Sequence, residues 1–316
     1  MFGRLVYLEG VNDARAESKI RGMTLQGALC DELTLFTEDF FAMLLSRLSL
    51  PGAKLFGSTN PDHPNHWLMV NYIKRQEELD MLVLKFLIDD NPALDPEYVK
   101  QLKREYTGVF YRRYILGEWC LAEGLVYEFD EERQTTTEIP ESGKYFISCD
   151  YGTLNPFSAG LWCVKDGRAV RIREYYYSGR ERAAQKTDEE YYAELEKLAG
   201  DLPVRYVVVD PSAASFMETI RRHGKFSVRK ARNEVLPGIR LTAMLLKAGR
   251  IFIHKDCKDA IREFGLYCWD DKGEVDKPLK VNDHAMDDIR YFCSTVLRRE
   301  LRNIPELRGI AADEKD

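Results

Sequence analysis

The sequence has no long run of apolar residues. In 316 residues, no stretch approaches the roughly 18 consecutive apolar positions that a membrane-spanning helix needs. Residues 1–10 also lack the basic and then apolar layout of a secretory signal. We therefore expect a soluble, intracellular protein that has no membrane partner.

Cysteines with the paired spacing of a metal site are missing too. The chain has seven cysteines, an odd number, and most of them lie inside apolar runs, as Cys149 and Cys163 do. Buried thiols in a reducing compartment explain this distribution best, so we expect no zinc site.

The chain has no excess of positive charge. Its net charge of −6 at pH 7 argues against a protein that coats nucleic acid and leaves any DNA contact to local basic patches. Two patches are candidates, although ordinary solvated surface explains each one equally well. The first consists of Arg171, Arg173, Arg180, Arg182 and Lys186, and the second of Arg221, Arg222, Lys225, Arg229, Lys230 and Arg232.

The sequence has no Gly-x-x-x-x-Gly-Lys-Ser/Thr loop, the element that cradles the phosphates of a nucleotide. It does contain the pattern of another part of an ATP site. The apolar run at residues 25–30 ends in Asp31-Glu32, the Walker B pattern, in which the first acid holds Mg²⁺ and the second orients the hydrolytic water. Such a short pattern also occurs by chance, so it is weak by itself.

The length suits two domains, and a polar stretch at residues 131–143 suggests where they join. We place the boundary near residue 125, which gives domains 1–125 and 126–316. In the first domain the pattern predicts a strand, a helix and a strand, typical of a partial P-loop ATPase-type α/β segment, followed by two helices. These elements cover residues 25–30, 39–48, 53–56, 95–106 and 110–116.

The second domain begins with a three-strand meander that turns at Lys165-Asp166-Gly167. A helix, a strand and further helices follow, which is a ribonuclease H-like order and predicts an α/β fold with a mixed sheet and flanking helices. The strands are expected at residues 145–149, 158–164, 169–176 and 204–209, and the helices at 187–198, 215–222 and 283–299, with two further segments at 239–248 and 250–253 before the closing helix.

Two aspartates each follow a strand of this domain. Asp150 ends the run at 145–149, and Asp210 ends the run at 204–209. If these strands are neighbours, the two carboxylates converge and repel each other unless a divalent cation neutralises them. In the closing helix, His284 and Asp287 are three residues apart and share one face, which supplies a third carboxylate and an imidazole.

Oxygen ligands of this kind suit Mg²⁺ or Mn²⁺, and two ions ~3.5–4 Å apart can activate a water and stabilise the leaving oxygen in phosphodiester hydrolysis. The sequence thus predicts a two-metal nuclease with Asp150, Asp210 and Asp287 as metal ligands and His284 beside them. Any one of these acids alone is more often a turn former or a helix N-cap, and Asp283 is itself a good N-cap candidate. A lone histidine is more often structural.

Several stretches together resemble one protein family. In the first half they are residues 25–32 (LQGALCDE), 57–61 (GSTNP), 89–92 (DDNP), 106–108 (YTG) and 117–119 (GEW), and in the second half 147–152 (ISCDYG), 207–212 (VVVDPS) and 283–291 (DHAMDDIRY). On these motifs the chain resembles, from about residue 20 to residue 300, the large terminase subunit of tailed bacteriophages, the motor and nuclease that packages DNA.

The resemblance implies roles for particular residues. It makes Asp31 and Glu32 the Walker B acids and places Asn60 in the coupling motif, where a polar residue senses the nucleotide. It favours Asp287 as the third nuclease ligand, while a swap to Asp288 or Asp283 stays open. It also implies double-stranded DNA, a portal protein and the small terminase subunit as partners, in the cytoplasm of the bacterial host.

The family's Walker A region is expected to precede residue 1, so we expect the chain to be a fragment, a split gene product or a prophage remnant. ATP would then bind only if that region were supplied, and the chain alone should have no ATPase activity. An endonuclease that cuts DNA largely independently of sequence is the function that we expect.

Three alternatives stay open. The chain can be an inactive remnant or an assembly piece that docks on the portal. It can be another ribonuclease H-like enzyme, such as a transposase or junction resolvase, although such enzymes would not share the upstream motifs. It can also be a complete ATPase whose Walker A segment lies on another polypeptide.

Overall fold

The computed structural model describes residues 5–11, 16–180, 182–270 and 276–301. The chain forms two compact units, of which the first comprises Met1–Leu94 and Tyr111–Leu121 and the second Asp95–Phe110 and Ala122–Asp316. The change of unit at Leu121 lies near the boundary that we propose at residue 125. Residues 95–110, which the sequence analysis assigns to the first domain, group with the second unit.

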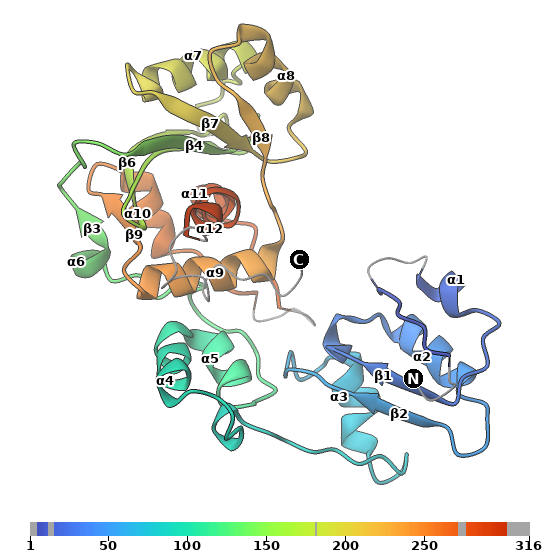
Figure 1. Ribbon diagram of the computed structural model, residues 1–316. Helices are drawn as coiled ribbons and strands as arrows, with labels where there is room; N and C mark the ends of the chain where they lie inside the picture. Colours follow the sequence, from blue (N-terminus) through green and yellow to red (C-terminus); the bar gives the residue numbers. More distant parts are fainter. Residues whose placement is uncertain (1–4, 12–15, 181, 271–275, 302–316) are drawn as a thin grey trace. The chain divides into compact units, whose positions relative to one another are not determined.

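The first unit contains a two-stranded parallel sheet of β1 (Gly27–Cys30) and β2 (Lys54–Gly57), connected by α2 (Glu38–Arg47) (Figure 1). The predicted order of strand, helix and strand is therefore present. Thr37 caps α2 by accepting a hydrogen bond from the backbone N–H of Phe40. The described part of this unit also contains two short α-helices, three 3₁₀ turns and the end of α5 (Gly108–Tyr114): the helices are α1 (Ala16–Ile20) and α3 (Trp67–Asn71), and the turns are Leu33–Leu35, Ile73–Arg75 and Ile88–Asp90.

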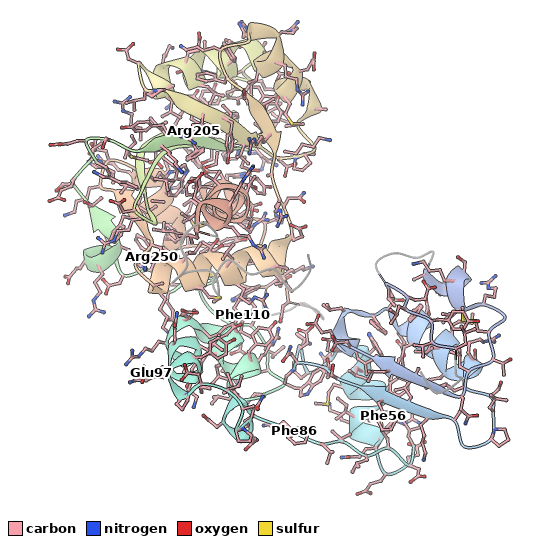
Figure 2. All side chains as sticks on the ribbon, in the orientation of Figure 1. Phe56, Phe86, Glu97, Phe110, Arg205 and Arg250 are labelled. Carbon is pink, nitrogen blue, oxygen red and sulfur yellow. The ribbon has the colours of Figure 1, made fainter. Side chains whose placement is uncertain are left out.

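The two faces of this small sheet differ. Ala28, Cys30 and Leu55 pack into the core with α2. On the other face, Leu29 is 84% exposed and Phe56, labelled in Figure 2, is 66% exposed. The sheet therefore has one buried face under α2 and one exposed apolar face.

The second unit is built on a seven-stranded sheet within the described residues, with the order β3-β9-β6-β5-β4-β7-β8. Strands β4, β5 and β6 form the predicted antiparallel meander, and β7, β8, β9 and β3 are added in parallel, so the sheet is mixed. The strands are β3 (Thr135–Thr136), β4 (Lys144–Asp150), β5 (Phe157–Lys165), β6 (Arg168–Tyr177), β7 (Val204–Val209), β8 (Val228–Lys230) and β9 (Ile251–His254).

Local sequence explains the meander turn and the helix that follows. Asp166 and Gly167 have φ values of 50° and 72°, the positive φ pair that a two-residue hairpin turn requires. Thr187 and Glu190 form a capping box at the start of α7 (Asp188–Ala199), and Gly200 ends that helix with a φ of 57°.

Helices cover both faces of the large sheet, with α7 and α8 (Ala214–His223) on one face and α11 (His284–Phe292) on the other (Figure 1). Ile147, Cys149, Val207 and Val209 point into the apolar core under α7 and α8. The remaining helices from residue 95 onward are α4 (Pro96–Glu105), α5 (Gly108–Tyr114), α6 (Glu131–Gln134), α9 (Val235–Lys247), α10 (Lys258–Phe264) and α12 (Arg298–Leu301).

The predicted α/β class, mixed sheet and ribonuclease H-like order are thus confirmed. The closing helix is more divided than predicted, because α11 passes through a π-helical turn, Cys293–Leu297, into α12. Strand β8 and helix α10 were not predicted, since three and seven residues are too short for a periodic pattern. No helix among the residues that the structure describes is long and apolar enough to cross a membrane.

Candidate functional site: acids at the carboxyl edge of the large sheet

Asp150 and Asp210 lie side by side at one edge of the large sheet. Strands β4 and β7 are parallel, and their register pairs Cys149 with Val209, so the next residue of each strand is an aspartate. Both side chains turn toward α11. Nδ1 of His284 lies 2.8 Å from Oδ2 of Asp150, and the hydroxyl of Tyr291 donates to Oδ2 of Asp210 at 2.6 Å.

Asp287 lies on α11 between His284 and Tyr291, the two residues that contact Asp150 and Asp210. It is buried, as expected for a side chain on the helix face that includes His284. Its carboxylate accepts two hydrogen bonds from Arg290, at 2.9 and 3.3 Å, and Nζ of Lys280 lies 3.3 Å from its Oδ2. Protein cations therefore neutralise this carboxylate already.

The hydroxyl of Tyr291 interacts electrostatically with all three aspartates. Burial raises the pKa of its hydroxyl, and the negative charges of Asp150 and Asp287 and the hydrogen bond to Asp210 raise it further. Asp210 contacts this hydroxyl directly, and the charges of Asp150 and Asp287 act on it. The structure brings together Asp150, Asp210, His284 and Asp287, the four residues predicted for the nuclease.

The two strand-end aspartates differ in their affinity for protons. Burial raises the pKa of Asp150 to about 6, although the hydrogen bond from His284 works against this shift. Burial alone would also raise the pKa of Asp210, but hydrogen bonds from Ser212 and Tyr291 outweigh it and lower that pKa below its usual value. Burial lowers the pKa of His284, whereas the hydrogen bond and charge of Asp150 raise it, with a net rise.

The acids border one region without forming a closed cage. Among the described residues, no group of three or more His, Cys, Asp or Glu side chains is close enough to hold one ion. The reason lies in the partners: Asp150 faces His284, Asp210 faces Tyr291, and Asp287 faces Arg290 and Lys280. An ion would have to displace Lys280 or draw Asp287 away from Arg290.

Asp288 lies on the other side of α11, fully buried against the sheet. Arg171 donates to both of its oxygens, at 2.6 and 3.0 Å, and the hydroxyls of Ser148 and Ser158 donate to them as well. With both oxygens engaged by a buried guanidinium, Asp288 is a structural anchor, and the geometry gives no support to its exchange with Asp287 as a ligand.

Asp283 occupies the N-cap position of α11, as predicted, but its side chain does not cap the helix. Its side chain makes no capping hydrogen bond, and Nζ of Lys280 lies 3.4 Å from its Oδ2. Glu263 of α10 supplies the cap instead, because its Oε2 accepts from the N–H of Ala285 at 2.7 Å while its Oε1 accepts from the Tyr176 hydroxyl at 2.6 Å.

Sequence reasoning missed Glu263, Lys280 and Tyr291. Tyr291 could have been predicted, because it lies four residues after Asp287 and seven after His284 and therefore shares their helix face. Glu263 and Lys280 come from segments without a motif, and only the packing of α10 and α11 brings them to the site.

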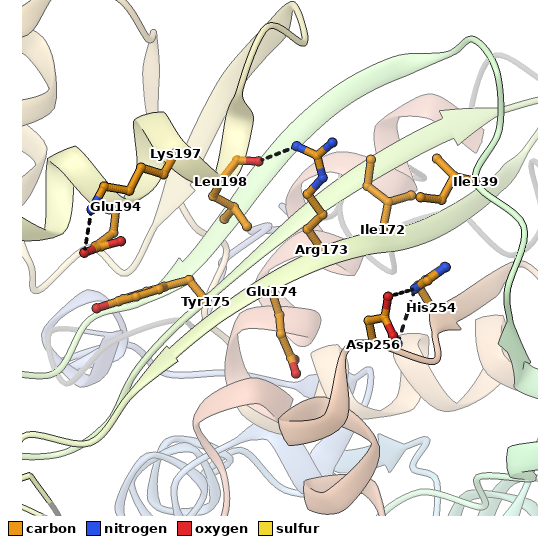
Figure 3. A pocket seen from close by; sticks show the side chains of 10 residues that line it. All are labelled: Ile139, Ile172, Arg173, Glu174, Tyr175, Glu194, Lys197, Leu198, His254 and Asp256. Atoms are coloured by element: carbon orange, nitrogen blue, oxygen red, sulfur yellow. Dashed lines mark hydrogen bonds and ion pairs between the residues drawn. The ribbon is translucent and has the colours of Figure 1, made fainter.

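A separate groove lies along β6, and its volume is about 440 Å³. Figure 3 shows that Arg173 reaches from β6 to the carbonyl of Leu198, while Glu194 pairs with Lys197 and Asp256 with His254. None of the predicted nuclease residues lines this groove, so we assign it no part in the chemistry of the acids.

In the first unit, the residues assigned to the ATP site follow β1 and β2. The register pairs Cys30 with Gly57, and Oγ of Ser58 donates to Oδ1 of Asp31 at 2.5 Å. Glu32 has a φ of 54°, and Asn60 is exposed two residues beyond Ser58. The first acid of the predicted Walker B pair therefore contacts the segment that is predicted as the coupling motif.

Fold and site define the class: an α/β protein whose ribonuclease H-like unit carries a row of acids at the carboxyl edge of its sheet. A family described as terminase large subunit, T4likevirus-type, N-terminal, matches residues 2–134. The large terminase of a thermophilic bacteriophage, solved in complex with ADP, is 42% identical and superimposes with a TM-score of 0.86 over 92% of this chain and 74% of that chain. A second crystal form of the same phage protein gives 43% identity, a TM-score of 0.88, and 92% and 73% coverage.

The terminase large subunit of Escherichia phage T5 is 22% identical over 223 residues, which are 66% of this chain. The chain spans about half the length of that curated relative. On the strength of the similarity to the thermophilic phage protein, the chain belongs to the large terminase family of bacteriophages. This membership confirms the resemblance and speaks against a transposase or a junction resolvase.

Proposed function

We propose that this chain is a metal-dependent DNA endonuclease that hydrolyses phosphodiester bonds of double-stranded DNA during phage genome packaging. The observation that carries the proposal is the register of β4 and β7, which sets Asp150 beside Asp210 and opposite His284 and Asp287 of α11. A pair of Mg²⁺ or Mn²⁺ ions, held by Asp150, Asp210 and Asp287, is the cofactor that we propose.

The donor set fits such ions. All three ligands are carboxylates, the oxygen donors that Mg²⁺ and Mn²⁺ prefer. Like charges gathered at a buried edge are costly unless a cation compensates them, and Lys280 and Arg290 fill that role at Asp287. Lys280 is 68% exposed at its side chain, so it can swing into solvent and leave its place to an ion.

Each residue has a part that follows from its surroundings. Asp210, with its lowered pKa, is ionised throughout the physiological range. Asp150 holds a proton up to about pH 6 and releases it above that. His284, hydrogen-bonded to Asp150, keeps that carboxylate oriented and is placed to take or give a proton there. Divalent ions bound at these acids would activate a water and neutralise charge on the scissile phosphate.

The proposal extends to the setting of the reaction. A chain that works as a terminase acts in the cytoplasm of the bacterial host, with double-stranded DNA as substrate and the portal protein and small terminase subunit as partners. Cleavage should depend little on sequence, because basic side chains and the carboxylate site contact phosphates and not bases.

Plasmid cleavage tests the proposal. The purified chain is incubated with supercoiled plasmid and Mn²⁺, Mg²⁺ or EDTA, beside the variants Asp150→Ala, Asp210→Ala and Asp287→Ala. We expect nicking and linearisation with Mn²⁺ or Mg²⁺, none with EDTA, and a loss of at least about 100-fold in each variant, the order that removal of a metal ligand or its support costs. Asp31→Ala is the control, which should cleave like the parent.

If the folded parent chain leaves plasmid intact with both ions, the nuclease proposal is wrong for this chain. The alternative of an inactive remnant or a portal-docking piece would then take its place.

One observation favours a second function for the first unit. Asp31 and Ser58 are hydrogen-bonded beside a sheet whose Leu29 and Phe56 face is bare. We propose that ATP binds there only when a Walker A segment with its phosphate loop is supplied from elsewhere.

A further inference from the structure

Most of the basic residues in the two patches already have partners. In the first patch, Arg171 is buried against Asp288, and Lys186 donates to Glu194 at 2.8 Å. In the second patch, the cations on and after α8 form ion pairs with acids of α7 and α8. These pairs are Arg221 with Glu218 at 3.2 Å, Arg222 with Glu189 at 2.6 Å and Lys225 with Glu196 at 3.2 Å.

Four cations of the patches lie at the carboxyl ends of their strands: Arg180 and Arg182 after β6, and Lys230 and Arg232 at and after β8. All four are exposed. Arg180 and Lys230 make no side-chain hydrogen bond or ion pair with any other residue that the structure describes. Arg182 stacks over the ring of Tyr177, with 5.8 Å from its guanidinium carbon to the ring centre.

Arg180 is fixed beside the turn that follows Asp150. Its backbone N–H donates to the carbonyl of Leu154 at 3.1 Å, and Arg182 is held in the same loop by a bond from its N–H to the carbonyl of Ser178, also 3.1 Å. Asp150 ends β4 only four residues before Leu154. The loop that carries both arginines therefore lies beside the turn that follows Asp150, on the β6 side of the acids.

Lys230 and Arg232 are fixed on the opposite side. Between them in sequence, Ala231 donates its N–H to the carbonyl of Val209, the residue before Asp210, at 2.8 Å. The N–H of Arg232 donates to Oγ1 of Thr295 at 2.9 Å, which ties this segment to the helix carrying the other acids. These cations flank the acids on the β8 side.

The strand order places the two basic segments and the acids in one row along the edge of the sheet. From β6 to β8 the sheet runs β6-β5-β4-β7-β8, so the acids of β4 and β7 stand between the two basic ends. Four strand spacings of about 4.8 Å make this row about 19 Å long. Along one DNA strand that length faces about five phosphates, at about 3.4 Å of axial rise each.

We infer that the carboxyl edge of the large sheet is a docking surface for duplex DNA, in which Arg180 and Arg182 bind phosphates on one side of the acids and Lys230 and Arg232 bind phosphates on the other. The inference rests on the proposed nuclease function, because the docked DNA would be the substrate of that nuclease. It needs neither metal nor cleavage for its test, because phosphate contacts form without them.

The test measures binding of a fluorescent 30-base-pair duplex in EDTA over a range of salt concentrations. Two double variants remove one basic end each: Arg180→Gln with Arg182→Gln, and Lys230→Gln with Arg232→Gln. A third, Arg221→Gln with Lys225→Gln, removes the same charge from ion-paired positions around α8 and serves as the matched control. Circular dichroism establishes that each variant is folded.

We expect each end variant to bind about tenfold more weakly, and the slope of log affinity against log salt to become shallower by about 1.8, that is, about 0.9 for each of two lost phosphate contacts. The control should change affinity less than about twofold. The inference is overturned if the parent binds no duplex at low salt, or if the end variants lose no more affinity than the control. If the end variants weaken duplex binding as expected but the parent cuts no plasmid, the nuclease proposal is wrong and the docking surface is still supported.

Discussion

At the scale of single residues, the ion pair of Lys280 and Asp287 should control how tightly the site binds a metal ion. Nζ of Lys280 lies within 3.4 Å of oxygens of both Asp283 and Asp287, the position of a resident counter-cation. A divalent ion that binds Asp287 has to compete with this ammonium group.

Replacing Lys280 by Ala should therefore strengthen metal binding. We expect the Mn²⁺ concentration at half saturation to fall about threefold, a modest change because the lysine is largely exposed. Isothermal titration with Mn²⁺ measures this. Lys277→Ala, which removes a lysine paired with Asp270 nearby, is the control and should leave Mn²⁺ binding unchanged. Weaker binding by the Lys280 variant would mean that the lysine organises the site instead of competing for it.

Asp150 gives the site a dependence on pH. Its pKa of about 6 in the folded chain lies above the usual 3.8, so the folded state holds a proton that the unfolded state has released between these pH values. The contribution of Asp150 to the free energy of unfolding is therefore most favourable below about pH 4 and declines as the pH rises to about 6.

The variant Asp150→Asn, which does not titrate, should gain stability relative to the parent across this range, by at most about 3 kcal/mol between pH 4 and pH 7. Urea unfolding of both proteins in EDTA measures the difference. A constant difference between the two proteins at both pH values would show that burial does not perturb Asp150.

At the scale of elements, α11 is held by a buried ion pair. Arg171 and Asp288 are both fully buried, and the pair is joined by Ser148, Ser158 and, at 3.7 Å, Glu174. Gly160 makes the room, because a Cβ at that position would collide with Nη1 of Arg171.

Breaking this pair should unfold the second unit more easily. Asp288→Asn leaves the guanidinium of Arg171 without its counter-charge in a dry interior, and we expect a loss of about 3 kcal/mol in the free energy of unfolding. Chemical denaturation measures it. The matched control is Glu78→Gln, which breaks the exposed pair with Arg75 and should have an effect near the limit of detection. An equal effect of the two substitutions would refute the anchoring role of Asp288.

A β-bulge explains why sequence could not reveal this anchor. In a regular strand, residues three apart point to opposite faces, so Arg171 and Glu174 would separate. The register of β5 and β6 shifts between Leu161 and Trp162, so both side chains lie on the same face of the sheet, Arg171 against Asp288 of α11 and Glu174 against the first N–H groups of α10. The predicted elements 145–149 and 204–209, by contrast, agree with β4 and β7 nearly to the residue, since β-branched and aromatic residues and strand-ending aspartates mark them locally.

At the scale of the whole molecule, the two units should differ in what they do alone. The sequence contains no phosphate loop, and the residues proposed for the ATP site are Asp31, which Ser58 contacts, Glu32 and the exposed Asn60. We expect no ATP hydrolysis above the buffer rate by the purified chain with Mg²⁺, measured by phosphate release, under conditions in which it cleaves plasmid. Hydrolysis that disappears in Glu32→Gln would contradict this expectation and show that the ATP site is sufficient as it stands.

The sequence by itself determined most of the elements, the α/β class and the family, and it predicted the acids Asp150, Asp210 and Asp287, because these depend on local patterns and short motifs. It left open whether Asp288 or Asp283 replaces Asp287, and it could not sort the basic patches into ion pairs and exposed cations. Tertiary structure decided the contacts of these residues. Register and helix packing set which carboxylate meets Arg171 and which meets Lys280, and strand order sets which cations stand beside the acids. Such contacts join elements that lie far apart along the chain, and no local pattern carries that information.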